Sequence, residues 1–185
     1  MKFWLSLVGY QLVWFAAVIG AGQGLAWPGI VAALVYAACQ MGAARHYKTD
    51  LSLMALAIVM GLLFDSSLIH AGLAYYAAPW PFAGMAPAWI LALWATFSLT
   101  FTQSLAYLQT RLWAAALLGA GGGPLAYLGA ARGWHAVNFA NPSWRALLCL
   151  SIGWGLATPA LAWFARRASS ATAPPSPIHL LGSVP

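Results

Sequence analysis

The chain carries very little charge. Only 5% of its 185 residues are charged and only two are acidic, whereas 63% are hydrophobic. Soluble domains contain about 25% charged residues, so this chain has too little polar surface to cover a water-soluble globule. The composition excludes a soluble domain and predicts an integral membrane protein.

The sequence also lacks the segments of roughly 10 alternating polar and apolar residues that build a membrane-spanning β-barrel. Its apolar segments are each near the roughly 20 residues that a helix needs to cross the bilayer. We predict an all-α polytopic bundle of six transmembrane helices in one domain over residues 1–167, followed by a flexible cytoplasmic tail over 168–185. The predicted spans are 3–22, 28–44, 51–77, 87–108, 112–131 and 146–165.

The basic residues lie at the ends of the apolar segments and predict the orientation of the chain. With the N-terminus in the cytoplasm, only Arg132 and Arg145 lie outside, and the residues inside are Lys2, Arg45, Lys48, Arg111, Arg166 and Arg167. This distribution satisfies the positive-inside rule and places both termini in the cytoplasm. We expect a multi-pass protein of a bacterial inner membrane, with membrane lipids as partners and no nucleic acid.

Asp65 is the most unusual residue, because it is the only carboxylate predicted to lie away from water. It sits in the middle of the predicted span 51–77, where an ionisable side chain is costly and marks a candidate functional site. At about 1.5 Å per residue, four groups of other spans reach a similar depth and could bind a ligand with it: Trp14, Ser98, Tyr127 and Thr158.

No basic residue is predicted at the level of Asp65, so an ion pair is not expected there. Burial then favours a neutral carboxyl group that donates a hydrogen bond to Tyr127 or to a hydroxyl. Two interpretations remain open. The bond fixes the packing of two helices, or the carboxyl group belongs to a proton relay or contacts a ligand.

His70 is a further candidate ligand contact. It follows Ser66 by four residues, so the two side chains share one helix face. Asp65 and His70 diverge by about 140° around the helix and do not form a natural pair of metal ligands. We predict no metal site, no cofactor and a buried, hydrogen-bonded His70, because the other histidines lie outside the predicted core: His46, His135 and His179.

Residues 119–124 read GAGGGP in the middle of a predicted span. Glycine and proline weaken a helix, so we predict that the fifth helix is kinked or broken there. One interpretation is close helix packing through the glycines. The other is an unwound segment in which Gly122 and Gly123 expose carbonyl groups to a buried ligand.

Aromatic residues gather in the connections predicted to lie outside the membrane. Trp80, Trp89 and Trp134 are the candidate residues of this outer face. They suit the membrane interface as an aromatic belt. The alternative is an aromatic cage around a ligand.

Three blocks of sequence resemble a known family. They are FW at 3–4 with GYQLVWF at 9–15, APWP at 78–81 with PAWILALW at 87–94, and GGPLAY at 122–127. They resemble the uncharacterised bacterial membrane family called domain of unknown function 2878, over about residues 3–165. The family has no assigned activity, so the resemblance implies no role for any residue. The family is similar to proteins that are often encoded beside cyclopropane-fatty-acid-synthase-like methyltransferases and flavin-dependent oxidases. This similarity implies a link to acyl-chain modification.

Three functions are compatible with the sequence. We expect a protein without catalysis of its own that binds a lipid or apolar small molecule, or docks a lipid-modifying enzyme, in a pocket bounded by Asp65, Tyr127 and the outer aromatic residues. The first alternative is a small-molecule carrier or a substrate-capturing transporter subunit. The second is a membrane-embedded enzyme of acyl-chain modification that uses Asp65 or His70 as an acid or base.

Overall fold

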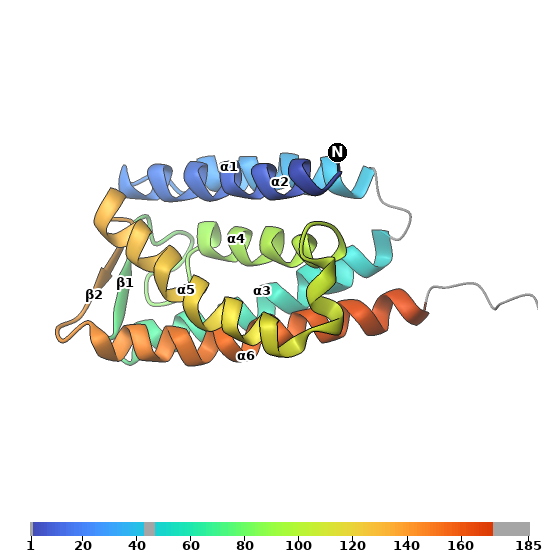
Figure 1. The fold of residues 1–185 in the computed structure, drawn as a ribbon. Coiled ribbons are helices and arrows are strands. Elements are labelled where there is room, and N and C mark those ends of the chain that lie inside the picture. Colours follow the sequence, from blue (N-terminus) through green and yellow to red (C-terminus); the bar gives the residue numbers. More distant parts are fainter. Residues whose placement is uncertain (1, 43–46, 172–185) are drawn as a thin grey trace, which may run out of the picture.

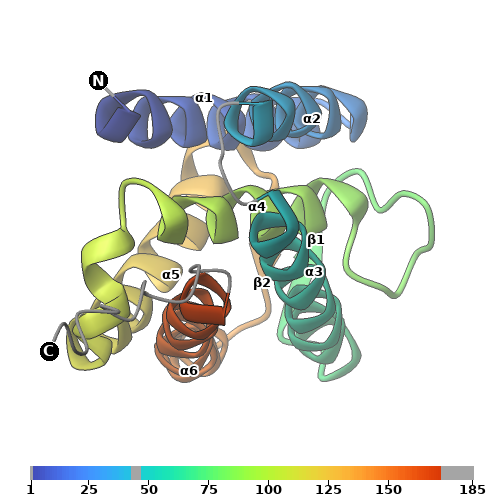
Figure 2. The same ribbon diagram turned by 90° about the vertical axis from the view of Figure 1, so that its right-hand side faces the viewer.

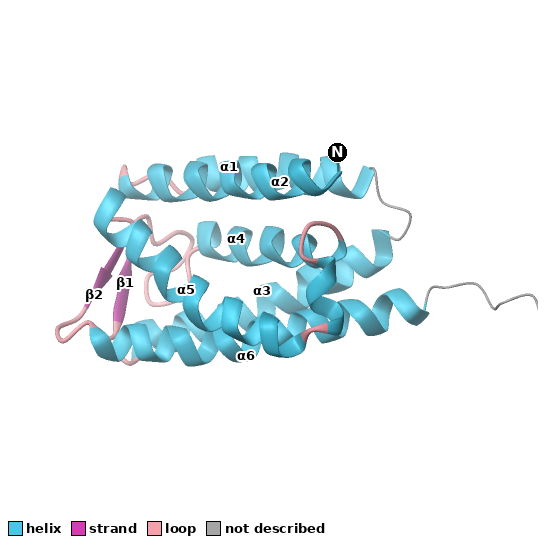
Figure 3. Ribbon diagram, viewed as in Figure 1, coloured by secondary structure: helices cyan, strands magenta, loops and turns pink. Residues whose placement is uncertain are grey.

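The computed structural model describes residues 2–42 and 47–171. The six α-helices are α1 (Lys2–Gly22), α2 (Trp27–Gly42), α3 (Tyr47–His70), α4 (Ala88–Leu99), α5 (Leu112–Trp134) and α6 (Trp144–Ala171). Two 3-10 helices follow α4, η1 (Thr100–Thr102) and η2 (Ala106–Thr110). Two short strands, β1 (Ala74–Tyr76) and β2 (Val137–Phe139), precede α4 and α6 (Figure 3). Each predicted span therefore overlaps one α-helix.

Four of these helices, α1, α3, α5 and α6, are long and apolar enough to cross a membrane. The other two are shorter, because α2 has 16 residues and α4 has 12. At about 1.5 Å per residue they extend about 24 and 18 Å, less than the roughly 30 Å of bilayer hydrocarbon. The fold is an all-α bundle with four candidate membrane spans.

The helices form three layers in Figures 1 and 2. The first layer holds α1 and α2, α4 lies in the middle, and the third holds α6 with most of α3 and α5; α5 is inclined, so that its end near the sheet reaches α1. Consecutive helices alternate in direction, so α1 begins and α6 ends at the same end of the bundle (Figure 1). The central α4 contacts α1, α2 and α3, and its buried side chains point to several sides. A helix that is apolar all round is expected at the centre of a fold.

The predicted span 87–108 is too long, because α4 ends at Leu99. The hydroxyls of Ser98 and Thr100 donate to carbonyls three residues earlier, and Thr102 donates both to the Leu99 carbonyl and to the Asp50 carboxylate. Side chains thus bond to the carbonyl groups at the end of α4, where the α-helical hydrogen bonds stop. Asp50 is only 3% exposed, so the expectation that Asp65 is the only buried carboxylate is wrong.

The predicted span 51–77 is also too long, because α3 ends at His70. Gly72 has a φ of 64°, a conformation that glycine adopts without strain, and the N–H groups of residues 72 and 73 bond back to the last turn of α3. The chain then enters β1, which pairs antiparallel with β2 so that Tyr76 lies opposite Val137. This two-stranded sheet, which the sequence did not predict, joins the α3–α4 and α5–α6 connections at one end of the bundle (Figure 1).

The fifth helix is not broken at its glycine run, because α5 is helical throughout and includes Pro124. Proline has no N–H group, so the carbonyl of Ala120 loses its partner in the helix. The hydroxyl of Ser151 in α6 donates to this carbonyl at 2.9 Å. A side chain of the neighbouring helix therefore replaces the missing hydrogen bond. The interpretation of an unwound segment is wrong, and the predicted kink stays a prediction.

The two ends of the bundle differ in their side chains. Lys48, Arg111, Arg166 and Arg167 lie near the end where α1 begins, whereas Arg132 and Arg145 lie near the sheet. Large aromatic residues are exposed at both ends: Trp27, Tyr75, Trp80, Phe82 and Trp144 near the sheet, and Phe3, Trp4, Tyr47, Tyr107 and Trp113 near the other end. The predicted orientation stays a prediction. Arg45 and residues 172–185 lie outside the described residues, and the first part of the predicted tail is helical, because α6 extends to Ala171.

Candidate functional site

Asp65 is fully buried in α3, and three side chains donate hydrogen bonds to its carboxyl group. The hydroxyls of Tyr76 and Tyr127 each donate to Oδ1 at 2.6 Å. The indole N–H of Trp94 donates to Oδ2 at 2.7 Å. These four buried side chains, called here the Asp65 cluster, come from α3, β1, α4 and α5. One carboxyl group thus links four segments of the chain.

The predicted pairing of Asp65 with Tyr127 is confirmed, but its direction is reversed, because the tyrosine donates. An indole N–H can only donate, so Oδ2 acts as an acceptor from Trp94. Tyr76 lies in β1, outside the spanning helices, and burial together with the neighbouring Asp65 raises the pKa of its hydroxyl well above the usual value. This hydroxyl therefore keeps its proton and serves as a donor.

Asp65 lies closer to one end of its helix than the sequence predicted. The predicted span 51–77 placed it centrally, but α3 ends at His70. At about 1.5 Å per residue, Asp65 lies roughly 8 Å from that end and about 27 Å from the other. The cluster belongs to the half of the bundle that carries the sheet, and this position brings β1 within reach of the carboxyl group.

The indole of Trp94 stacks on that of Trp154 in α6, with ring centroids 4.1 Å apart and an interplanar angle of 17°. Two glycines make room for this pair. A Cβ atom added to Gly61 would meet Trp94, and one added to Gly123 would meet Trp154, both at prohibitively short distances. Gly123 therefore serves close packing, which is the first of the two interpretations of the glycine run.

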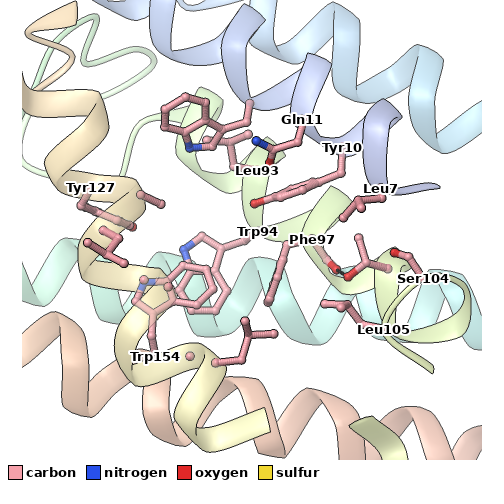
Figure 4. A pocket seen from close by; sticks show the side chains of 18 of the residues that line it. Leu7, Tyr10, Gln11, Leu93, Trp94, Phe97, Ser104, Leu105, Tyr127 and Trp154 are labelled. Atoms are coloured by element: carbon pink, nitrogen blue, oxygen red, sulfur yellow. Dashed lines mark hydrogen bonds between the residues drawn. The ribbon is translucent and has the colours of Figure 1, made fainter. Parts of the chain in front are cut away.

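A cavity of about 480 Å³ lies beside the cluster, between α1, α4, α5 and α6. Figure 4 shows Tyr10 and Gln11 on one side of this space and Trp94 with Trp154 on the other. Tyr127 also lines it, whereas Asp65 does not. The cavity wall thus includes two residues of the Asp65 cluster, and the carboxyl group stands behind them.

The match to a sequence family covers most of this fold. A family model described as "Protein of unknown function (DUF2878)" matches residues 3–160, from the start of α1 to the second half of α6. The chain belongs to the DUF2878 family. No curated protein and no solved structure matches this DUF2878 chain.

The other residues predicted at the depth of Asp65 do not contact its carboxyl group in this DUF2878 protein. Trp14 lines the cavity and packs edge-on against Trp134, with ring centroids 5.7 Å apart. Ser98 and Thr158 are buried, but their hydroxyls donate to carbonyls of their own helices at 2.7 Å. Neither hydroxyl faces the Asp65 carboxyl group, and Ser98 lies at the end of α4 away from the sheet.

His70 is exposed, so the prediction of a buried histidine is wrong. Its Nδ1 lies 2.7 Å from the Ser66 carbonyl, and the Ser66 hydroxyl accepts a hydrogen bond from the N–H of Ala86 at 3.0 Å. The first contact lies within the last turn of α3. The second joins α3 to the loop that precedes α4. The described residues contain no group of three or more His, Cys, Asp or Glu side chains that could hold a metal ion.

The aromatic candidates of the outer face lie in different surroundings. Trp80 is 60% exposed on its loop, whereas Trp89 is 1% exposed and donates its N–H to the Ala77 carbonyl at 2.9 Å. Trp134 packs against α1, where its ring contacts Phe15. Gly122 and Gly123 both line the cavity, but a Cβ atom on Gly122 would meet only Leu118 Cδ1, at 4.0 Å.

Two members of the cluster were not among the predicted site residues. Tyr76 was assigned to the third helix, where it would lie far from Asp65. Trp94 lies in an apolar run and carries no charge to mark it. Gly61 could have indicated the position of Trp94, because it precedes Asp65 by four residues and therefore shares its helix face. A small residue beside a buried carboxylate indicates that a bulky partner packs there.

Proposed function

We propose that this protein crosses a bacterial inner membrane six times, with both termini in the cytoplasm, and holds an apolar, lipid-like molecule without catalysing a reaction. The observation that carries the proposal is the cavity of about 480 Å³ between α1, α4, α5 and α6. Ligand cavities in proteins are commonly about 300–1,000 Å³ and lined mainly by apolar and aromatic side chains with a few polar groups. This cavity fits that description.

The mouth of the cavity suits entry from the lipid phase. Leu118 and Leu125 of α5 line it and are 41% and 68% exposed. Gln11 of α1 lines it from the facing helix and is also exposed. These positions face the side of the bundle, which in a membrane is covered by acyl chains. A lipid-like molecule would reach the cavity without passing through water.

The Asp65 cluster supports the cavity from behind. Its hydrogen bonds fix the orientation of the Trp94 indole and the Tyr127 phenol, and both rings form part of the cavity wall. Binding sites are more selective when such second-layer bonds hold the contacting groups in place. We therefore assign Asp65 a positioning role and assign the contact with the molecule to the rings in front of it.

A second hollow of about 590 Å³ lies between α1 and α2, but it is a weaker candidate. Its lining residues Leu5, Leu12 and Val35 are each more than half exposed, so it is a groove on the outer surface. Two of its polar residues are already paired, because the Gln40 amide donates to the Tyr36 hydroxyl at 2.9 Å. This groove suits ordinary contact with membrane acyl chains.

Mass spectrometry of the molecules retained by the purified protein tests the proposal, with Gly122→Leu as the variant. A Cβ atom at position 122 would make only an ordinary contact, 4.0 Å from Leu118 Cδ1, and the position lines the cavity, so the variant should fold and lose the retained molecule. Gly121→Leu is the matched control, since a Cβ atom there would meet no atom within 4 Å and the position does not line the cavity.

The expected result is at least a fivefold loss of one specific molecule in Gly122→Leu and no change in Gly121→Leu. Equal retention in the two variants would refute binding in this cavity. Retention of bulk lipid alone in all three proteins would do the same, and would direct attention to docking of a lipid-modifying enzyme.

A further inference from the structure

We infer that the molecule held in this cavity is an apolar chain with an uncharged oxygen group, a hydroxyl or a carbonyl, away from its two ends, and that Tyr10 and Gln11 bind this group. The inference rests on the proposed function and adds the chemical class of the ligand. It follows from the shape of the cavity and from the position of its unpaired polar side chains.

The cavity is elongated along the bundle. Its lining extends from Leu7 to Trp14 on α1 and from Ile90 to Thr100 on α4. At about 1.5 Å per residue, these stretches are roughly 10 and 15 Å long. With a volume of about 480 Å³, the space fits part of a chain that lies parallel to the helices.

The polar groups at the end of the cavity near η1 are already paired. The Thr100 hydroxyl donates to the Phe97 carbonyl at 2.6 Å. The Ser104 hydroxyl is hydrogen-bonded to the hydroxyl of Ser6 in α1 at 3.1 Å. This end therefore offers no free hydroxyl group to a ligand.

The polar groups at the end of the cavity near the sheet are also engaged. Tyr127 and Trp94 both donate to the carboxyl group of Asp65. The Trp154 N–H is closed off from the cavity and lies beside the Tyr127 hydroxyl, which can accept one hydrogen bond while it donates another. Indole and phenol rings, rather than free polar groups, therefore face a ligand at this end.

Two polar side chains of α1 lie between these ends. Tyr10 and Gln11 line the cavity and point into it (Figure 4). Neither the Tyr10 hydroxyl nor the Gln11 amide makes a hydrogen bond within the described part of the chain. At about 1.5 Å per residue, both lie roughly 12–14 Å from the beginning of α1. An unpaired polar group at such a depth in hydrocarbon is costly, so a polar group of the ligand is expected there.

The polar group of the ligand is uncharged. The cavity lining has neither a basic nor an acidic residue, and an isolated charge in an apolar surrounding is strongly disfavoured. A charged end of the molecule would therefore stay outside the cavity. A hydroxyl group both donates and accepts, as do a phenol and an amide, and a carbonyl group accepts from both. Either oxygen group can pair with Tyr10 and Gln11.

The test is photolabelling in lipid nanodiscs with an uncharged alkyl chain that carries a diazirine group, followed by peptide mass spectrometry. Labelling of Ile90 and Leu93 reports on the cavity, because both line it and are only 3% and 9% exposed. A probe dissolved in the surrounding lipid does not reach such side chains. Leu63 on α3, which is 68% exposed and lies outside the cavity, reports on labelling from the bulk lipid.

Three competitors are methyl esters of equal chain length. One has a hydroxyl group at mid-chain, one has the hydroxyl next to the ester, and one has none. A net hydrogen bond changes affinity by about 2- to 13-fold. We expect the mid-chain hydroxyl to halve the labelling of Ile90 and Leu93 at a roughly tenfold lower mole fraction than the other two. None of the three should change the labelling of Leu63.

Two variants remove the polar groups of α1 and nearly keep the shape of the side chains. Tyr10→Phe and Gln11→Leu should each reduce the preference for the mid-chain hydroxyl to about threefold or less, while the midpoint of the unsubstituted chain stays the same. Tyr107→Phe is the matched control and should keep the full preference, because Tyr107 is 53% exposed and lies outside the cavity. If one of the two cavity variants does not fold, the other still decides.

The outcomes separate this inference from the proposed function. Equal midpoints for the three competitors, or a preference for the hydroxyl next to the ester, would overturn the mid-chain oxygen group and leave cavity binding intact. A mid-chain preference that neither cavity variant reduces would overturn the assignment to Tyr10 and Gln11. Labelling of Leu63 without competable labelling of Ile90 and Leu93 would overturn the proposed function itself.

Discussion

The Asp65→Asn substitution should destabilise the protein by about 1–3 kcal/mol. Asparagine has nearly the same shape but offers one acceptor oxygen, whereas the carboxylate accepts two tyrosine hydroxyls on Oδ1 and the Trp94 N–H on Oδ2. If the amide oxygen faces the tyrosines, the amide NH2 faces the Trp94 N–H and both donors are unpaired. If the amide is reversed, both hydroxyls lose their acceptor.

The magnitude follows from the two donors left unpaired in either orientation. Hydrogen bonds between membrane helices contribute about 0.6 kcal/mol on average and up to about 1.7 kcal/mol. Two such losses give the expected 1–3 kcal/mol. A protonated Asp65 would behave differently, because asparagine reproduces one donor and one acceptor and the cost would then approach zero.

The assay is unfolding of the purified protein in mixed micelles with increasing SDS, followed by tryptophan fluorescence. Ser67→Ala is the control on the same helix, because the Ser67 hydroxyl is exposed and donates only to the Phe64 carbonyl. It should change the free energy of unfolding by less than about 0.5 kcal/mol. An equally small change in Asp65→Asn would refute the assignment of three donors to an ionised carboxylate.

Two further predictions follow. Ser151→Ala should lower the free energy of unfolding by about 1 kcal/mol, because it leaves the Ala120 carbonyl beside proline without a donor; unchanged stability in the SDS titration would show that this bond contributes nothing. In a background without the native cysteines, Ala83→Cys should react with an impermeant thiol reagent from outside the cell and Ser169→Cys should not. Ala83 is preferred to Gly84, whose φ of 92° would strain a cysteine. The opposite pattern of labelling would invert the predicted orientation.

Hydropathy predicted the number and order of the α-helices, because each is an uninterrupted apolar run between polar or turn-forming residues. It could not predict the helix ends that lie within apolar sequence. The residues after Gly72 are as apolar as those before it, so the turn is marked by one glycine alone. Likewise, α4 ends where threonine and serine hydroxyls can bond to the backbone, a feature to which an average of hydropathy is insensitive.

The sequence predicted one contact of the candidate site but not its other members. Counting residues along a helix gives a level in the bundle, and this brought Tyr127 together with Asp65. The count fails where a helix end is misplaced and does not give the direction of a side chain, so Ser98 and Thr158 were predicted beside Asp65 although they bond within their own helices. The cavity itself depends on how closely α1 packs beside α5, and no local sequence pattern gives the distance between these two helices.

The three donors of the Asp65 cluster all follow Asp65 in the chain, and this order has a consequence for biogenesis. They come 11, 29 and 62 residues later. A carboxylate within a membrane helix makes translocon-mediated insertion less favourable, by up to about 2.5–3.5 kcal/mol at the helix centre. The third helix therefore leaves the ribosome before any of its partners, and its carboxyl group is fully satisfied only after the fifth helix has been synthesised and inserted.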